Sequence, residues 1–142
     1  MNDLTIDLRT VPLRLLVDIC YSSAKAKGFH EGGAPVGARI DQKLMLVVGE
    51  LAEAQEELRA GHAPTDIYFT SPAGETLVGV VGKSNDDLAA DGYKPEGFPI
   101  ELADAIVRLF DLAGSLGIDL EAAVQTKLTY NLTRPYKHGR VF

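Results

Sequence analysis

Apolar residues recur at helical spacing in four stretches of the chain, and the predicted helices cover about 11–27, 41–60, 99–116 and 119–131. The third of these is apolar around most of its circumference, which is typical of a central helix. N-caps are expected at Thr10, Asp41 and Asp119, and glycine follows the ends of the first three helices. The pattern predicts a mainly all-α fold in one domain.

The stretch between the second and third helices has a different pattern. Residues 67–70 and 76–81 are β-prone runs, and the residues between them include Pro72 and Gly74. This pattern favours a small β-hairpin. Residues 83–99 are rich in proline, glycine and acidic side chains, and they are expected to form a surface loop.

Two of the predicted helices each carry a pair of acids three residues apart. Glu50 and Glu53 lie on the second helix, and Glu101 and Asp104 lie on the third. Residues at this spacing share one helical face, so packing of the two helices would gather four carboxylates. Each like-charge contact at roughly 4 Å costs about 4 kcal/mol at an effective dielectric of about 20. A cation is therefore expected between them.

The donor set indicates which cation this is. Carboxylate oxygens are hard ligands that suit Mg²⁺, with Mn²⁺ as an alternative, and the chain has no cysteine cluster or paired histidines for zinc. A simpler interpretation remains open for each pair taken alone. Glu50 and Glu53 would then form a solvated face, and Glu101 and Asp104 would stabilise a helix N-terminus through its dipole.

Polar and basic residues follow in the last helix and the tail. Lys127 and Asn131 fall on the inward side of the last helix, where an unpartnered polar group is costly, so each is expected to have a polar partner or a ligand. The tail that follows is basic, with Arg134, Lys137 and His138. It is either a phosphate-binding patch or a solubilising segment.

Composition excludes several classes of protein. The 142 residues carry a net charge of −6, which argues against a nucleic-acid partner. The chain has one cysteine, no apolar run long enough to cross a membrane, and no signal-peptide pattern in residues 1–10. These features predict a soluble, cytoplasmic protein.

Taken together, residues 44–54, residues 98–104, Lys127, Asn131 and residues 134–139 resemble the MazG-like all-α nucleoside triphosphate pyrophosphohydrolases. The resemblance implies a single MazG-like domain over 1–142, a four-helix bundle with an insertion at about 63–96. The insertion is a lid, an oligomer contact or decoration. It also implies a homodimer or homotetramer that cleaves nucleoside triphosphates to monophosphate and pyrophosphate.

The same resemblance assigns roles to residues. Metal ligation falls to Glu50, Glu53, Glu101 and Asp104. Substrate binding falls to Lys127, Asn131, Arg134, Lys137 and His138. Glu53 is the predicted catalytic base, with Glu50 or Glu57 as alternatives. Two other functions remain open, a non-catalytic helical binding or assembly module and a metal-dependent hydrolase of another phosphoanhydride.

Overall fold

The computed structural model describes residues 10–32, 39–78 and 82–135, and over these ranges the chain is mainly helical, as predicted. The elements in chain order are α1 (Leu13–Ala26), α2 (Ile40–Arg59), β1 (Tyr68–Thr70), β2 (Thr76–Val78), α3 (Asn85–Ala90), β3 (Lys94–Glu96), α4 (Phe98–Leu116) and α5 (Leu120–Leu132).

The four long helices lie where the apolar periodicity placed them, but only one of the three predicted caps is correct. Asp119 caps α5, and its carboxylate accepts a hydrogen bond from the backbone N–H of Ala122 at 2.9 Å. The predicted N-cap at Thr10 is wrong, because α1 begins after Pro12 and has no side-chain cap. The predicted N-cap at Asp41 is also wrong, because α2 begins one residue earlier, at Ile40. The Asp41 carboxylate therefore lies inside the first turn, where the helix dipole favours an acid.

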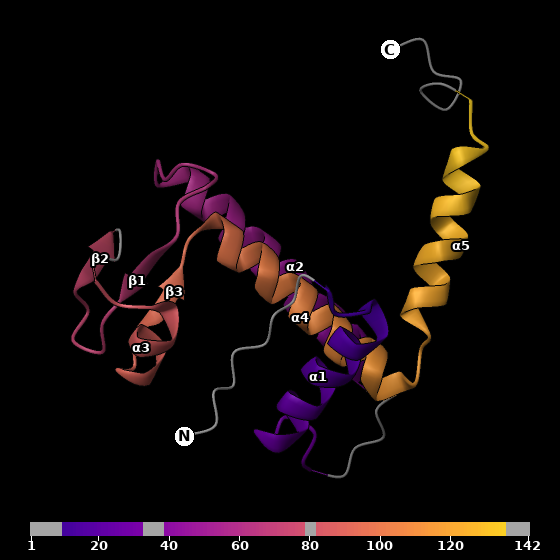
Figure 1. Ribbon diagram of the computed structural model, residues 1–142, viewed down its shortest axis with the longest axis horizontal. Coiled ribbons are helices and arrows are strands. Elements are labelled where there is room, and N and C mark those ends of the chain that lie inside the picture. Colours follow the sequence, from indigo (N-terminus) through magenta and orange to yellow (C-terminus); the bar gives the residue numbers. More distant parts are fainter. Residues whose placement is uncertain (1–9, 33–38, 79–81, 136–142) are drawn as a thin grey trace.

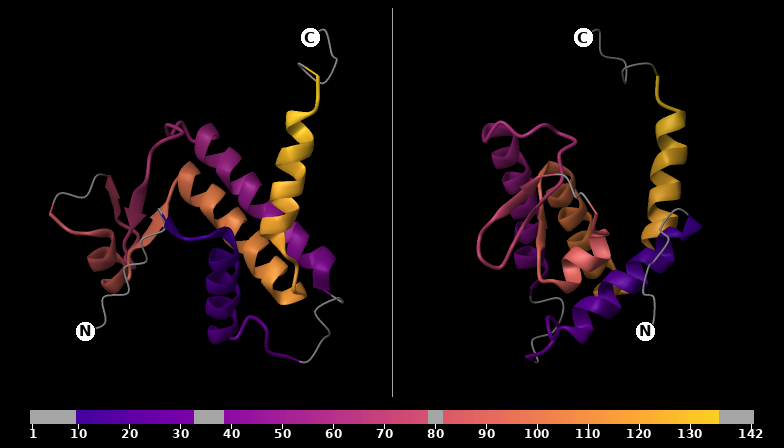
Figure 2. Two further views of the ribbon diagram at one scale, coloured as in Figure 1. Left: turned by 45° about the vertical axis from the view of Figure 1, so that its right-hand side comes forward. Right: turned by 60° about the vertical axis from the view of Figure 1, so that its left-hand side comes forward.

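The body of the molecule consists of three helices. Antiparallel α2 and α4 lie side by side, and α1 packs across α4 (Figures 1 and 2). Gly114 allows this crossing, because a Cβ atom built there would lie 2.6 Å from the Cβ of Tyr21. The buried core of the three helices is formed by Val17, Val47, Ala54, Ala105, Leu112 and Ala113.

The predicted hairpin is present, and it is part of a larger unit. β1 pairs antiparallel with β2, and β3 pairs with the other edge of β1, giving the strand order β2-β1-β3. The prediction of a loop over 83–99 is therefore wrong. Ser84 and Asp87 form a capping box that starts α3, and Leu88 on this helix is fully buried, as Phe69 of β1 nearly is.

A tight junction joins this sheet to α4. Gly97 has φ = 113°, and a Cβ built there would lie 2.3 Å from the carbonyl oxygen of Asp66. Only glycine tolerates both conditions at once. The sheet is thus attached directly to the first turn of α4, beside Glu101.

α5 extends away from the three-helix body (Figure 1), and its contacts are mainly with α1. It has no buried residue. Val124 and Leu128 are exposed and Leu120 is half-buried, so the described part of the chain leaves the apolar side chains of this helix largely uncovered. Over the described residues, the predicted four-helix bundle is therefore not confirmed. Among the described residues, no helix combines the length and apolar character needed to cross a bilayer.

Candidate metal site and adjoining pocket

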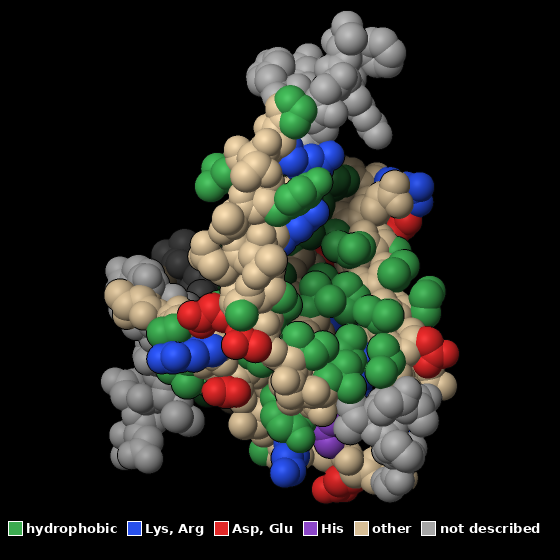
Figure 3. Space-filling model, turned by 90° about the vertical axis from the view of Figure 1, so that its right-hand side faces the viewer, with side chains coloured by type: hydrophobic (Ala, Val, Ile, Leu, Met, Phe, Trp, Pro, Cys, Tyr) green, Lys and Arg blue, Asp and Glu red, His purple; other side chains and the backbone are tan. Residues whose placement is uncertain are grey.

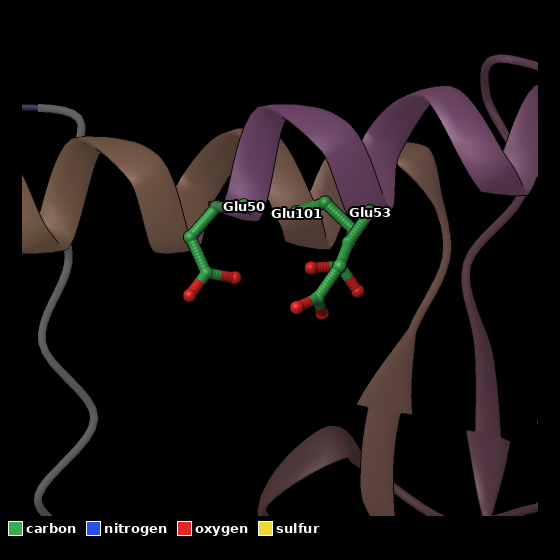
Figure 4. Close-up of side chains that lie close together, drawn as sticks. All are labelled: Glu50, Glu53 and Glu101. Carbon is green, nitrogen blue, oxygen red and sulfur yellow. The ribbon is translucent and has the colours of Figure 1, made fainter. Parts of the chain in front are cut away.

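Three carboxylates meet where α2 packs against α4. Glu50 and Glu53 project from α2 and Glu101 from α4, and one oxygen of each lies within 4.8 Å of the others. Figure 4 shows all three side chains pointing to the same side of the helix pair. The spacing of three residues aligns the two acids of α2, and the antiparallel packing brings Glu101 to them.

Glu101 is the most constrained member of this acid cluster. It is only 4% exposed, and within the described ranges its carboxylate has no hydrogen-bond or ion-pair partner. Burial raises its pKa to about 7, with further contributions from the negative charges of Glu53, Asp104 and Glu50. A buried carboxylate surrounded by other carboxylates favours either a proton or a bound cation.

The other members of the cluster have different surroundings. Glu50 is buried and accepts a hydrogen bond from Nε of Arg108. Glu53 is exposed, and no ion pair to it is found in the part of the chain that the structure describes. Asp104 lies next to this group without belonging to it. Its pKa is raised, first by desolvation and then by the charge of Glu50.

Two further acids, Glu57 of α2 and Asp111 of α4, are engaged by other side chains. Both oxygens of Glu57 accept from the Tyr68 hydroxyl, at 3.0 and 3.2 Å, and one lies 2.5 Å from Nδ1 of His62. Partial burial and this hydrogen bond raise the pKa of Tyr68 to about 12. With both oxygens engaged, Glu57 is a poor choice for the catalytic base.

Asp111 organises the polar wall of a neighbouring pocket. Its two oxygens lie 2.6 Å from Nε2 of His30 and 2.6 Å from Nζ of Lys43. The ring of His30 in turn packs edge-on against Tyr21, with centroids 5.0 Å apart. A salt bridge to Lys43, a hydrogen bond to His30 and the packing of His30 on Tyr21 thus link Asp111 of α4 to α2 and α1.

This pocket lies between α1, α2 and α4 and has a volume of about 620 Å³, within the range of small-molecule sites. Asp104 and Arg108 belong to its lining, so it opens next to the acid cluster. Its other lining residues are Ile19, Cys20, Ser23, Ala24, Lys27, Phe29, Arg39, Gln42, Lys43, Leu46, Val107 and Asp111. Apolar surface, one exposed aromatic ring and four cationic side chains are thus gathered beside three carboxylates.

The predicted substrate-binding residues lie far from this site. Lys127, Asn131 and Arg134 are exposed on or just beyond α5, and the Lys127 and Arg134 cations lie over the ring of Tyr130, at 5.3 and 5.9 Å. Glu101 is near the start of α4, and α5 begins only after the far end of that helix. At 1.5 Å per residue, the end of α4 lies about 22 Å from Glu101 along the helix axis. Lys137 and His138 lie outside the described residues.

Sequence reasoning missed several residues that the fold brings to the site. His30 and Lys43 belong to no sequence motif that indicated a role, and Lys94 lies in the stretch 83–99 that was predicted to be a loop. Of the four predicted metal ligands, three are grouped closely and Asp104 is adjacent.

Comparisons of the chain with models of protein families, with curated proteins and with solved structures found no match. The resemblance to MazG-like enzymes therefore remains a prediction that rests on its motif residues.

Proposed function

We propose that this protein is a Mg²⁺-dependent nucleoside triphosphate pyrophosphohydrolase of the MazG-like type, with Mn²⁺ as an alternative metal. The observation that carries the proposal is Glu101, a largely buried residue whose carboxylate oxygens reach solvent without a partner in the described chain, grouped with two other carboxylates. Burial of the rest of the side chain makes its free charge costly, and a cation can reach the open carboxylate oxygens to offset that cost.

The donor set fits a hard divalent cation. Glu50, Glu53 and Glu101 supply only oxygen, and Mg²⁺ is commonly held by a few carboxylates together with water and substrate phosphates. Asp104 lies next to this group, and the charge of Glu50 contributes to its raised pKa. A bound Mg²⁺ would neutralise phosphate charge and increase the acidity of a bound water.

The chain's own residues then have separate tasks. The pocket accepts the nucleoside, with Phe29 as a stacking surface and Lys27 at its rim. Arg108 faces both the cluster and the pocket, so it can turn from Glu50 to a phosphate when a metal neutralises Glu50. Glu53, exposed at the cluster, accepts a proton from the attacking water.

A second copy of the chain belongs to this proposal. A 13-residue helix without a buried residue is marginal in water, and α5 exposes Leu128, Tyr130 and Leu132. Hydrophobic side chains also gather on the face of the body beside α5 (Figure 3). Packing in a homodimer or homotetramer would cover these surfaces. It would also allow α5 of a neighbouring copy to bring its Lys127, Asn131 and Arg134 to the site.

The oligomer is tested by light scattering after size-exclusion chromatography. We expect the wild type to have the mass of a dimer or tetramer, and Leu128→Glu to lower that mass. Gln125→Glu adds the same charge to an exposed position on the same helix and serves as the matched control. A monomeric wild type at micromolar concentration would contradict this part of the proposal.

The reaction is tested with a panel of nucleoside triphosphates and Mg²⁺ in ¹⁸O-labelled water. Attack on the α-phosphorus places the label in the monophosphate and releases unlabelled pyrophosphate. Label in orthophosphate, with diphosphate accumulating, would indicate a hydrolase of another phosphoanhydride. Absence of turnover across the panel would favour the non-catalytic module.

A further inference from the structure

The inserted sheet turns one of its faces toward the acidic stripe of α2. Side chains alternate along a strand, and Tyr68 pairs with Glu96 and Thr70 with Lys94, so these four residues share one face. Phe69 and its partner Pro95 lie on the opposite face. The Tyr68 hydroxyl donates to Glu57 of α2, which shows that its face is the one directed at the helix.

Strand β3 brings Lys94 close to the cluster. Figure 4 shows this strand rising beside the carboxylates of Glu53 and Glu101 before it passes into α4. Nζ of Lys94 donates to Glu96 at 3.0 Å. That hydrogen bond is the main cause of the raised pKa of Lys94, and the charges of Glu101 and Glu53 add to it.

Lys94 is also less firmly held than the two cations that pair with buried or nearly buried acids on the helices. Arg108 pairs with the buried Glu50, and Lys43 pairs with the nearly buried Asp111. Lys94 pairs with Glu96 while 67% of its side chain is exposed. The Glu96 side chain is 19% exposed, but the ammonium end of the pair is open to solvent, so an anionic ligand can reach Lys94 and compete with Glu96 for it.

The pocket, the acid cluster and the sheet follow one another along the two helices. On α2 the pocket residues come first, the cluster follows at Glu50 and Glu53, and the contact with the sheet comes last at Glu57. On α4 the direction is reversed, with Glu101 near the sheet and the pocket residues after it. The cluster therefore lies between the pocket and the sheet.

We propose that Lys94 is a phosphate-binding residue, which makes the inserted sheet one wall of the site. The inference rests on the proposed function. The nucleoside occupies the pocket, Glu50, Glu53 and Glu101 would hold a divalent cation that neutralises the triphosphate, and Lys94 binds the phosphates that leave as pyrophosphate. When the ligand arrives, the Lys94 ammonium exchanges the Glu96 carboxylate for phosphate oxygens, and no covalent bond changes.

Binding of an uncleavable triphosphate tests this role without relying on turnover. The probe is an α,β-methylene nucleoside triphosphate with Mg²⁺, measured by calorimetry. Lys94→Gln should weaken binding about tenfold, the loss of one charge-assisted hydrogen bond. Glu96→Gln should strengthen binding by a few fold, because it removes the competitor. Lys83→Gln is the matched control, since Lys83 belongs to the same insertion but pairs with Asp91.

Mn²⁺ binding in the absence of nucleotide separates this role from a structural one. Lys94→Gln should bind Mn²⁺ as tightly as the wild type or more tightly, because a nearby positive charge has been removed. Weaker Mn²⁺ binding, or unchanged analogue binding, would overturn the role of Lys94. Analogue binding with the expected Lys94 dependence, but without hydrolysis of true triphosphates, would overturn the proposed reaction alone.

Discussion

Replacing Glu101 with glutamine should stabilise the protein in the absence of metal, by an amount that grows as the pH rises from 4.5 to about 7 and is constant above that. The surroundings of Glu101 raise its pKa from 4.5 to about 7, so the folded state favours the neutral form. The resulting stabilisation is complete below pH 4.5 and is lost as the pH rises through 7. Glutamine has the shape of the neutral acid at every pH, so Glu101→Gln avoids this loss.

The size of the effect follows from the same values. A pKa raised from 4.5 to about 7 corresponds to about 3 kcal/mol, and screening by solvent at the open side of the cluster brings this to about 1–3 kcal/mol. For a chain of this length, that range raises the melting temperature by about 3–9 °C. The measurement is thermal unfolding followed by circular dichroism, in EDTA at fixed protein concentration, at pH 5 and pH 8.5.

With magnesium present, the wild type should become more stable than Glu101→Gln. At a concentration about 100 times its dissociation constant, Mg²⁺ adds about 2.7 kcal/mol to the wild type and much less to Glu101→Gln. Glu56→Gln is the control, because it removes a carboxylate from α2, the helix of Glu50 and Glu53, where Glu56 forms an exposed pair with Arg59 outside the cluster. The reasoning is refuted if Glu101→Gln is no more stable than the wild type at pH 8.5, or if its advantage is the same at pH 5.

Three other substitutions test separate parts of the structure. Arg108→Met leaves the buried Glu50 unpaired, so it should lower the metal-free stability by about 1–3 kcal/mol in urea unfolding, and Mg²⁺ should restore most of the loss. Gly114→Ala places a methyl group against Tyr21 and should cost about 1–3 kcal/mol, whereas Gly49→Ala, with open space around it, should not destabilise. Asn131→Ala should weaken substrate binding at unchanged stability, because its side chain is exposed in the single chain.

Each of these predictions has a contrary outcome. Unchanged urea unfolding of Arg108→Met would mean that Glu50 needs no cation. Equal stability of the two alanine variants would mean that α1 and α4 are less closely packed than the Gly114 contact indicates. A less stable Asn131→Ala with normal activity per folded molecule would assign Asn131 to an interface instead of a substrate.

The sequence by itself determined the features that depend on neighbouring residues. The extents of the long helices follow from apolar periodicity, and the cap at Asp119 follows from a short polar side chain before a helical run. The two acid pairs were also readable, because a spacing of three residues fixes a common helical face. The β-prone runs identified the hairpin for the same local reason.

Tertiary structure decided which of these local features meet. Antiparallel packing of α2 on α4 groups Glu101 with Glu50 and Glu53, while Asp111 of the same stripe pairs with His30 and Lys43. Pairing of β3 with β1 then places Lys94 near the cluster. The alignment of one element on another depends on contacts between distant residues, such as Gly97 against Asp66, and no local pattern encodes such contacts. For the same reason the apolar residues of α5 were visible in the sequence, but whether they are covered depends on a surface that the described residues do not supply.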